Sequence, residues 1–278
     1  MKKILFLLSI LLSFLANAQL KEGKVLYERT IQMQFRGDAQ FRSDGGPPPP
    51  PSDNIPRERK DRFELSFANN QSLWESMPEM DDNNNFGGGG EGPGGFRVMR
   101  FGGSSDLSYH NFTTGKRLDE QELSSKKYIV EDSIQKIAWK MTGQTKTILG
   151  HTVQKVSGER YGTRTAMTME NGEMKRQMMP DTTIVNAWIA MDIPVPAGPE
   201  QFQGQLPGLI LELEMNNGRI VYRALEISSK VNVSAIKEPK GGKRITAAEF
   251  TKLRDKEFEE MRRNMPAGGG RRVQLVTQ

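Results

Sequence analysis

The stretch GPEQFQGQLPGLILELEMNNGRIVYRALEI, residues 198–227, decides the fold class of this chain of 278 residues. It contains two runs of mainly apolar residues, 209–215 and 219–227, each interrupted by charged residues. Asn217 and Gly218 lie between the runs and tolerate the positive φ angles of a tight turn. The stretch therefore predicts two antiparallel strands joined by that turn.

A structural motif stands at the entry to the first of these strands: Leu206, Pro207, Gly208, Leu209 and Ile210. Proline fixes its own φ angle, and glycine takes positive φ without strain. We therefore expect a type II turn with Pro207 and Gly208 at its centre. Such a turn would direct the chain into the strand and close one end of a sheet over a core. On this strand we expect Glu212 and Glu214 to face solvent.

Short segments with period-two alternation recur through the chain and predict further strands. These segments are 25–35, 62–67, 127–132, 136–141, 145–149, 152–156, 164–170 and 183–191. Turns are expected at Asp132-Ser133 and at Gly150-His151. Because the strands are short and tightly connected, we expect one curved antiparallel sheet, open or resembling a half-barrel, in a mostly β fold.

One α-helix is expected near the C-terminus. Thr246 and Glu249 have the spacing of a capping box, and Phe250, Leu253 and Phe258 follow at near-helical spacing. We expect this helix to pack on the sheet or to project from it with its charged face in solvent.

Two segments have compositions that do not form a core, and we interpret them as long disordered insertions. Residues 42–60 contain five consecutive prolines, and residues 81–103 are dense in glycine. Residues 266–278 are expected to form a flexible tail. The remaining chain, residues 19–265, is expected to fold as a single domain.

The first 18 residues have the pattern of a secretory signal peptide. Lys2 and Lys3 precede an apolar run that is too short to span a bilayer, and Ala16-Asn17-Ala18 provides a small-residue cleavage site. The chain contains no cysteine, so we expect no lipoprotein attachment. The sequence predicts export to the periplasm or the exterior, with no transmembrane span in the mature chain.

Composition excludes several classes of function. The net charge of +5 at pH 7 includes the two leader lysines, so the mature chain is only weakly basic and no nucleic-acid partner is expected. The absence of cysteine excludes disulfides, thiolate metal sites and thiol nucleophiles. His110 and His151 are the two histidines, and neither lies in a Ser-His-Asp motif. We therefore expect a protein that is not an enzyme.

LPGLILELE, residues 206–214, together with IPVPAGP, residues 193–199, resembles the GLPGLI family of exported Bacteroidetes proteins. Residues 127–156 look like the central segment of that family, and residues 24–35 look like its opening strand. The resemblance implies export, a mostly β fold and no established activity. It also implies an envelope role beside TonB-dependent outer-membrane receptors. Gln205 stands where the motif has its first glycine, and Val153 stands where many members have cysteine.

Two sets of residues are candidate binding sites. A methionine-rich stretch is a candidate copper site, because thioethers are soft ligands that suit Cu(I): Met167, Met169, Met174, Met178 and Met179. The alternative is a β-hairpin with methionine as apolar filler. Trp74, Trp139 and Trp188 each lie in a predicted strand and are candidates for lining an apolar ligand cavity, with core packing as the alternative.

These features predict an exported accessory or binding protein of the cell envelope. Its partner would be an outer-membrane receptor of a TonB-dependent transport system or another envelope protein. One alternative is copper binding through the methionine hairpin, and without copper no cofactor is expected. Another alternative is a carboxylate-dependent hydrolase, which would need two converging carboxylates such as Glu212 and Glu214.

Overall fold

The computed structural model describes residues 20–33, 57–78, 107–170 and 173–264, with the backbone alone for residues 164–170, 173–177, 261, 262 and 264. The expected signal peptide, the glycine-dense segment 81–103 and the tail 266–278 lie outside the described residues. Most of the proline-rich segment also lies outside them, but its last residues, 58–60, belong to a strand. No helix in the described part of the chain is long and apolar enough to cross a membrane.

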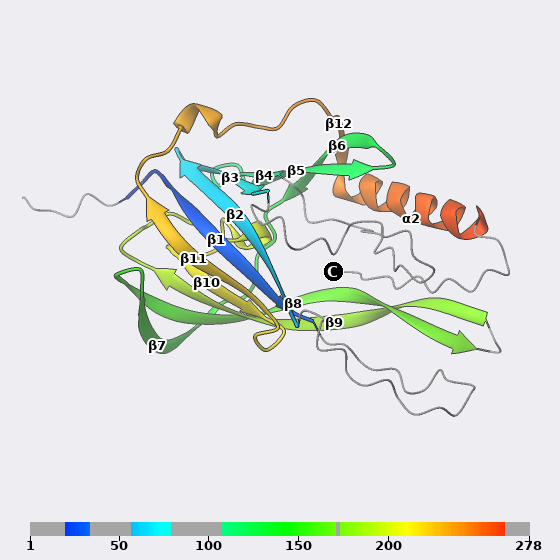
Figure 1. The fold of residues 1–278 in the computed structure, drawn as a ribbon, viewed down its shortest axis with the longest axis horizontal. Coiled ribbons are helices and arrows are strands. Elements are labelled where there is room, and N and C mark those ends of the chain that lie inside the picture. The colour runs from blue at the N-terminus through cyan, green and yellow to red at the C-terminus, as the bar shows by residue number, and fades with distance from the viewer. Residues whose placement is uncertain (1–19, 34–56, 79–106, 171–172, 265–278) are drawn as a thin grey trace, which may run out of the picture.

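The described residues form one open sheet of twelve strands, which confirms the mostly β expectation (Figure 1). The strand order is β12-β6-β5-β4-β3-β2-β1-β11-β10-β9-β8-β7, and every pair is antiparallel except β12 with β6. The strands are β1 (Gly23–Gln32), β2 (Glu58–Ala68), β3 (Gln71–Ser76), β4 (Leu107–Asn111), β5 (Lys116–Leu123), β6 (Lys126–Ser133), β7 (Lys140–Ile148), β8 (His151–Glu170), β9 (Glu173–Ala190), β10 (Leu209–Met215), β11 (Ile220–Ser228) and β12 (Lys243–Thr246).

The chain makes two long crossings over this sheet, one from β6 to β7 and one from β11 to β12. Strands β1 to β6 spread from the centre toward one side, and the chain then crosses to the opposite edge to begin β7. The expected hairpin around Asp132-Ser133 is therefore wrong, because β6 pairs with β5 and β12 and residues 134–139 form no strand. We call residues 134–139 the crossing segment.

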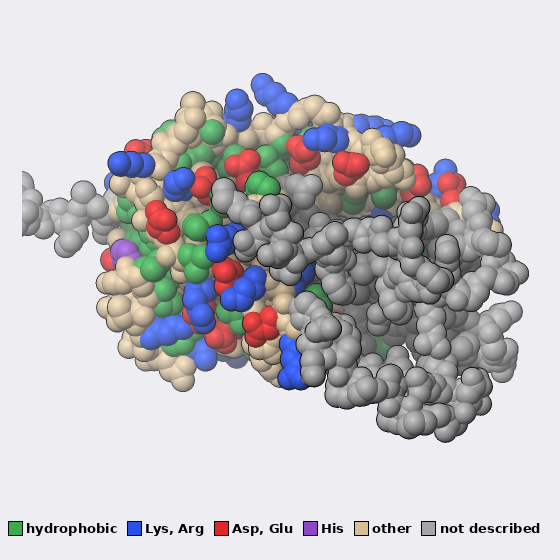
Figure 2. Space-filling model, in the orientation of Figure 1, with side chains coloured by type: hydrophobic (Ala, Val, Ile, Leu, Met, Phe, Trp, Pro, Cys, Tyr) green, Lys and Arg blue, Asp and Glu red, His purple; other side chains and the backbone are tan. Residues whose placement is uncertain are grey.

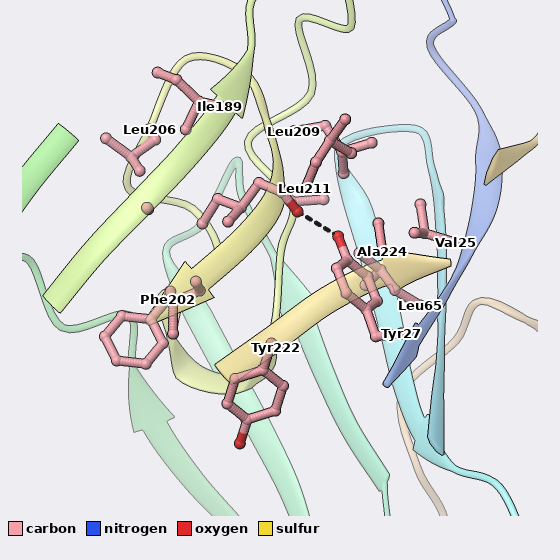
Figure 3. Close-up of a cluster of buried hydrophobic side chains, with 14 of the residues drawn as sticks. Val25, Tyr27, Leu65, Ile189, Phe202, Leu206, Leu209, Leu211, Tyr222 and Ala224 are labelled. Atoms are coloured by element: carbon pink, nitrogen blue, oxygen red, sulfur yellow. Dashed lines mark hydrogen bonds between the residues drawn. The ribbon is translucent and has the colours of Figure 1, made fainter. Parts of the chain in front are cut away.

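The main hydrophobic core lies on one face of the sheet, beneath the chain between β9 and β10 (Figure 3). Apolar side chains of that chain, from Ile193 to Leu206, pack against the buried residues of β1, β2, β9, β10 and β11. The Tyr27 hydroxyl donates a 2.5 Å hydrogen bond to the carbonyl oxygen of Ile210 and joins the first strand to β10. The predicted apolar face of residues 62–67 is confirmed, because Phe63, Leu65 and Phe67 are buried.

A smaller core lies on the opposite face, beside β3 to β6. Tyr109 and Leu118 are buried there against Ile236, which follows the 3-10 helix η2 (Val233–Ala235). Because successive side chains of a strand point to opposite faces, the sheet is covered on both sides in this region.

The hairpin expected from the opening stretch is confirmed as β10 and β11. Asn216, Asn217 and Gly218 turn the chain with φ angles of 53°, 56° and 80°. The expected type II turn is wrong, because Gly208 does not have a positive φ angle. A Cβ atom at Gly208 would lie 2.4 Å from the carbonyl oxygen of Ala190. Glycine is required there because two backbone segments approach closely, since no side chain fits between them.

The expected helix is α2 (Ala247–Asn264), which follows β12 directly. The capping box is confirmed: the Glu249 amide donates to Thr246 Oγ1 at 3.2 Å, and the Thr246 amide donates to the Glu249 carboxylate at 2.8 Å. Phe250 packs edge-on against Tyr128 of β6, with ring centroids 5.8 Å apart. The helix therefore lies at the β12 edge of the sheet (Figure 1).

Candidate binding groove

A groove of about 870 Å³ lies between the crossing segment and the outer part of β8. Gln135 to Ala138 form one wall, and residues 157–163 of β8 form the other. Gln201, Phe202 and Gln205 come from the chain between β9 and β10 and complete the lining near the core. We call this feature the β8 groove.

The β8 groove exists because β7 ends before β8 does. Pairing between β7 and β8 stops at Lys140 opposite Ser157, whereas β8 and β9 remain paired as far as Glu170 opposite Glu173. On the other side, β10 pairs with β9 only from Val185 onward. The outer parts of β8 and β9 therefore form a two-stranded arm beyond the sheet (Figure 1). At about 3.3 Å per residue, the arm is about 40 Å long.

Gln205 holds the crossing segment away from the edge of β8. Its side-chain oxygen accepts hydrogen bonds from the Ile137 amide at 3.0 Å and from the Trp139 indole at 3.2 Å. Ile137 and Trp139 then pack over Gly158, where an added Cβ would lie 2.6 Å from Ile137. This bend explains why the alternating residues 136–141 do not continue β7 along β8.

Buried ionic contacts fix the η1 helix (Glu200–Phe202), which supplies Gln201 and Phe202 to the groove. The Arg29 side chain is 5% exposed and contacts the Asp61 carboxylate at 2.7 Å and the Glu200 carboxylate at 3.2 Å. The guanidinium also lies 4.9 Å from the centroid of the Phe63 ring. This arrangement ties η1 to β1 and β2, so this part of the groove is preformed.

The exposed walls of the β8 groove are mainly basic. Lys136, Lys140 and Arg160 line it, and none of them forms an ion pair with a described residue. Glu159 carries the only carboxylate among the lining residues that the structure describes, and its oxygen accepts a 2.5 Å hydrogen bond from the Tyr161 hydroxyl. That bond and the Glu159 charge raise the pKa of Tyr161, so the phenol stays protonated as a donor. The Tyr161 side chain is 74% exposed.

The structure does not bring the three tryptophans into one cavity. Trp74 is buried in the main core, where it stacks on Phe63 with ring centroids 4.9 Å apart. Trp188 is partly buried and packs against the margin of that core, with Lys146 Nζ 4.2 Å from its ring centroid. Trp139 lies in the crossing segment and not in a strand, and it packs edge-on against Phe202.

The predicted methionine hairpin is present as the paired ends of β8 and β9, and its turn, Asn171-Gly172, lies outside the described residues. Met169 pairs with Met174, and Met178 pairs with Thr165. Met178 is 59% exposed and Met179 is 37% exposed. The side chains of the other three methionines lie outside the described part of the structure.

Glu212 does not face solvent as the alternation predicts, and this expectation is wrong. Its side chain is 5% exposed and contacts Lys146 at 2.6 Å and Arg223 at 3.1 Å. Burial alone would raise the Glu212 pKa, but the hydrogen bonds and charges of the two cations outweigh it and lower the pKa. Figure 2 shows acidic and basic side chains intermixed over the visible face of β1, β10 and β11. Because Lys146 and Arg223 both contact the Glu212 carboxylate, Glu212 is unsuited to form a catalytic pair with Glu214.

The structure contains a buried polar cluster that carried no sequence signal. His110 of β4 is completely buried, and neither ring nitrogen has a hydrogen-bond partner among the described residues. Burial, with a smaller contribution from Arg117, lowers the His110 pKa to about 3. Beside it, Arg117 contacts Asp119 at 2.9 Å and Asp132 at 3.3 Å. Neither the Asp119 nor the Asp132 carboxylate lines the β8 groove.

The other histidine, His151, is the first residue of β8, and its Nδ1 atom lies 2.6 Å from the carboxylate of the exposed Asp192.

Residues 139–212 match the model of a Bacteroidetes-type family described as "Protein of unknown function (Porph_ging)". The matched region includes β7 to β9 and ends within β10. No curated protein matches the chain. Similar solved structures include "Structure of PNGF-II in P21 space group" at 13% identity and a TM-score of 0.48, and "Structure of PNGF-II in C2 space group" at 15% identity and a TM-score of 0.45. The alignments cover 85% and 84% of this chain and 33% of each of those chains, so this chain spans about a third of their length.

Proposed function

We propose that this chain is an exported, non-enzymatic binding protein of the bacterial cell envelope that holds its partner in the β8 groove. We also propose that it belongs to the GLPGLI family and acts beside a TonB-dependent outer-membrane receptor, as the sequence resemblance implies. The observation that carries the proposal is a groove of about 870 Å³ with preformed walls, placed where β8 extends beyond its neighbour.

The chemistry of the groove supports binding more than catalysis. Among the described residues that line it there is no histidine or aspartate, and the single glutamate there is engaged by Tyr161. A carboxylate-dependent hydrolase needs two carboxylates at the reacting bond. Polar amides, three basic side chains and an apolar floor at Phe202 suit recognition of a partner surface.

A site-specific crosslink tests the proposal. A photoreactive benzoylphenylalanine replaces Tyr161 in the groove or, as a matched control, Leu225 on β11, which is 38% exposed and outside the groove. Both variants are expressed with the native leader in the source bacterium and irradiated. We expect an envelope protein to be captured from position 161 and not from position 225. Equal capture from both positions, or none from position 161, would refute the groove as the binding site.

Copper binding is a second candidate, favoured by the register of the arm. The pairing places Met167, Met169, Met174 and Met178 on one face of the ribbon and Met179 on the other. Met169 pairs with Met174, and Met167 lies two residues from Met169 on the same strand, a spacing that suits a Cu(I) site built from thioethers. The Met169→Leu/Met174→Leu variant should lose Cu(I) binding in a competition assay with a chromogenic chelator. Met179→Leu should retain it, and an equal effect of both changes would rule out this site.

A further inference from the structure

We propose that the β8 groove accepts an extended, acidic segment of a partner polypeptide, which adds a strand to the free edge of β8 at residues 158–163. This inference rests on the proposed function and names the class of partner. It requires three features, which are an unpaired strand edge, room beside that edge and side chains that select the incoming chain.

The edge is continuous with a regular ladder. Residues 158–163 pair with β9 without a register shift, and no described strand lies on their other side. Alternate residues of such an edge present backbone N–H and C=O groups outward, which is the arrangement that strand addition uses. An incoming strand would continue the line of β7, whose pairing with β8 stops at Ser157.

The two outermost edges of the sheet are less suitable for pairing. The β7 edge is interrupted by a register shift between Met141 and Thr145, and Gly143 within it has a φ angle of 76°. The β12 edge is only 4 residues long. Bulges and short edge strands are devices that prevent edge pairing. The edge of β8 in the groove carries neither device.

The room beside the edge is maintained by the protein itself. The crossing segment would cover residues 158–163 if it continued β7, but Gln205 binds the Ile137 amide and the Trp139 indole and diverts it over Gly158. The diverted segment then forms the opposite wall of the groove. An added strand would lie between this wall and β8.

The basic side chains that line the β8 groove favour an acidic partner segment. Lys136 and Lys140 lie on the crossing-segment side, and Arg160 lies on the strand itself, with Glu159 as the only opposing carboxylate of the described lining. Phe202 and Ile184 provide apolar surface for alternate side chains of the incoming strand. The recognised segment should therefore alternate acidic residues with residues of moderate apolar size.

The test uses the mature chain and three fluorescein-labelled decapeptides, with binding measured by fluorescence anisotropy. The parent peptide alternates aspartate with valine and threonine. The second peptide carries asparagine for aspartate. The third keeps the parent side chains but has N-methyl groups on alternate amides, so that one edge cannot form backbone hydrogen bonds. We expect the parent peptide to bind at least tenfold more tightly than either of the others.

Two charge-reversed proteins complete the test. Lys136→Glu/Arg160→Glu changes the groove, and Lys237→Glu/Lys240→Glu changes exposed residues before β12 by the same net charge. We expect the first to weaken parent binding at least tenfold and the second to leave it within twofold. Equal binding of the parent and N-methylated peptides, or equal loss in both proteins, would overturn strand addition at this edge. Capture from position 161 combined with either result would leave the proposed function standing and reject only this inference.

Discussion

Replacement of Gly208 by alanine tests the reason for the glycine in the opening stretch. An alanine Cβ at this position would lie 2.4 Å from the Ala190 carbonyl oxygen and 3.0 Å from its carbonyl carbon. Ordinary van der Waals contact begins near 3.4 Å, so the ends of β9 and β10 would have to separate by about 1 Å. Both contacts are with backbone, which cannot rotate away as a side chain can.

We expect Gly208→Ala to lower the free energy of unfolding by about 2–3 kcal/mol, the upper part of the range for overpacking a core. For a domain of this size, that loss corresponds to a decrease in Tm of roughly 4–12 °C. Urea unfolding followed by circular dichroism measures the free energy, and calorimetry measures Tm.

Gly162→Ala is the matched control for this measurement. Gly162 lies in the arm, its φ angle is not positive, and an added Cβ would meet no atom within 4 Å. Alanine there should be neutral or stabilising by about 0.5–1 kcal/mol, because it reduces the freedom of the unfolded chain. If Gly208→Ala were as mild as Gly162→Ala, close backbone approach would not be the reason for glycine at position 208.

Three further substitutions test the groove and the buried charges. Gln205→Leu removes the acceptor for the Ile137 amide and the Trp139 indole, so we expect a loss of about 1–3 kcal/mol and faster hydrogen exchange at Ile137; unchanged exchange would show that Gln205 does not hold the crossing segment. The pKa of Glu212 is lowered in the folded protein, so its stabilising contribution is present above the unfolded pKa and is lost as pH falls through the lower folded pKa. Glu212→Gln should therefore destabilise the protein at pH 7, and its difference from wild type in urea unfolding should shrink below about pH 4; a difference independent of pH would argue against this ion-pair role. The pKa of His110 is lowered to about 3 in the folded protein, so between pH 6.5 and 3 the unfolded state binds the extra proton. The free energy of unfolding should then fall by up to about 1.4 kcal/mol per pH unit as pH decreases through that range. His110→Phe should flatten this part of the plot of unfolding free energy against pH. An unchanged plot would show that the folded imidazole titrates normally.

Local signals in the sequence predicted several elements correctly. The hairpin β10–β11 followed from two apolar runs around Asn217 and Gly218, and the start of α2 followed from the Thr246–Glu249 capping box. Each depends on residues a few positions apart, whose backbone preferences act wherever the chain is placed. The buried face of Phe63, Leu65 and Phe67 was predictable for the same reason, because alternation fixes which side chains share a face.

The candidate groove was not predictable in this way, because its parts come from distant segments. The alternation of residues 136–141 favours a strand, but Gln205 binds Ile137 and Trp139 from 68 and 66 positions away. No residue near Ile137 in the sequence indicates that its amide will bind Gln205 and not pair with β8. The groove beside β8 is a consequence of this diversion.

The sequence by itself determined the mostly β class, the central hairpin and the capped helix, since turn chemistry, alternation and capping are properties of neighbouring residues. Only the tertiary structure decided that Glu212 is buried between Lys146 and Arg223, that Gly208 lies against the Ala190 backbone and that β8 keeps a free edge. The physical reason is that burial, close approach and pairing depend on which segments meet in space. Period-two patterns specify the faces of a strand but not its neighbours.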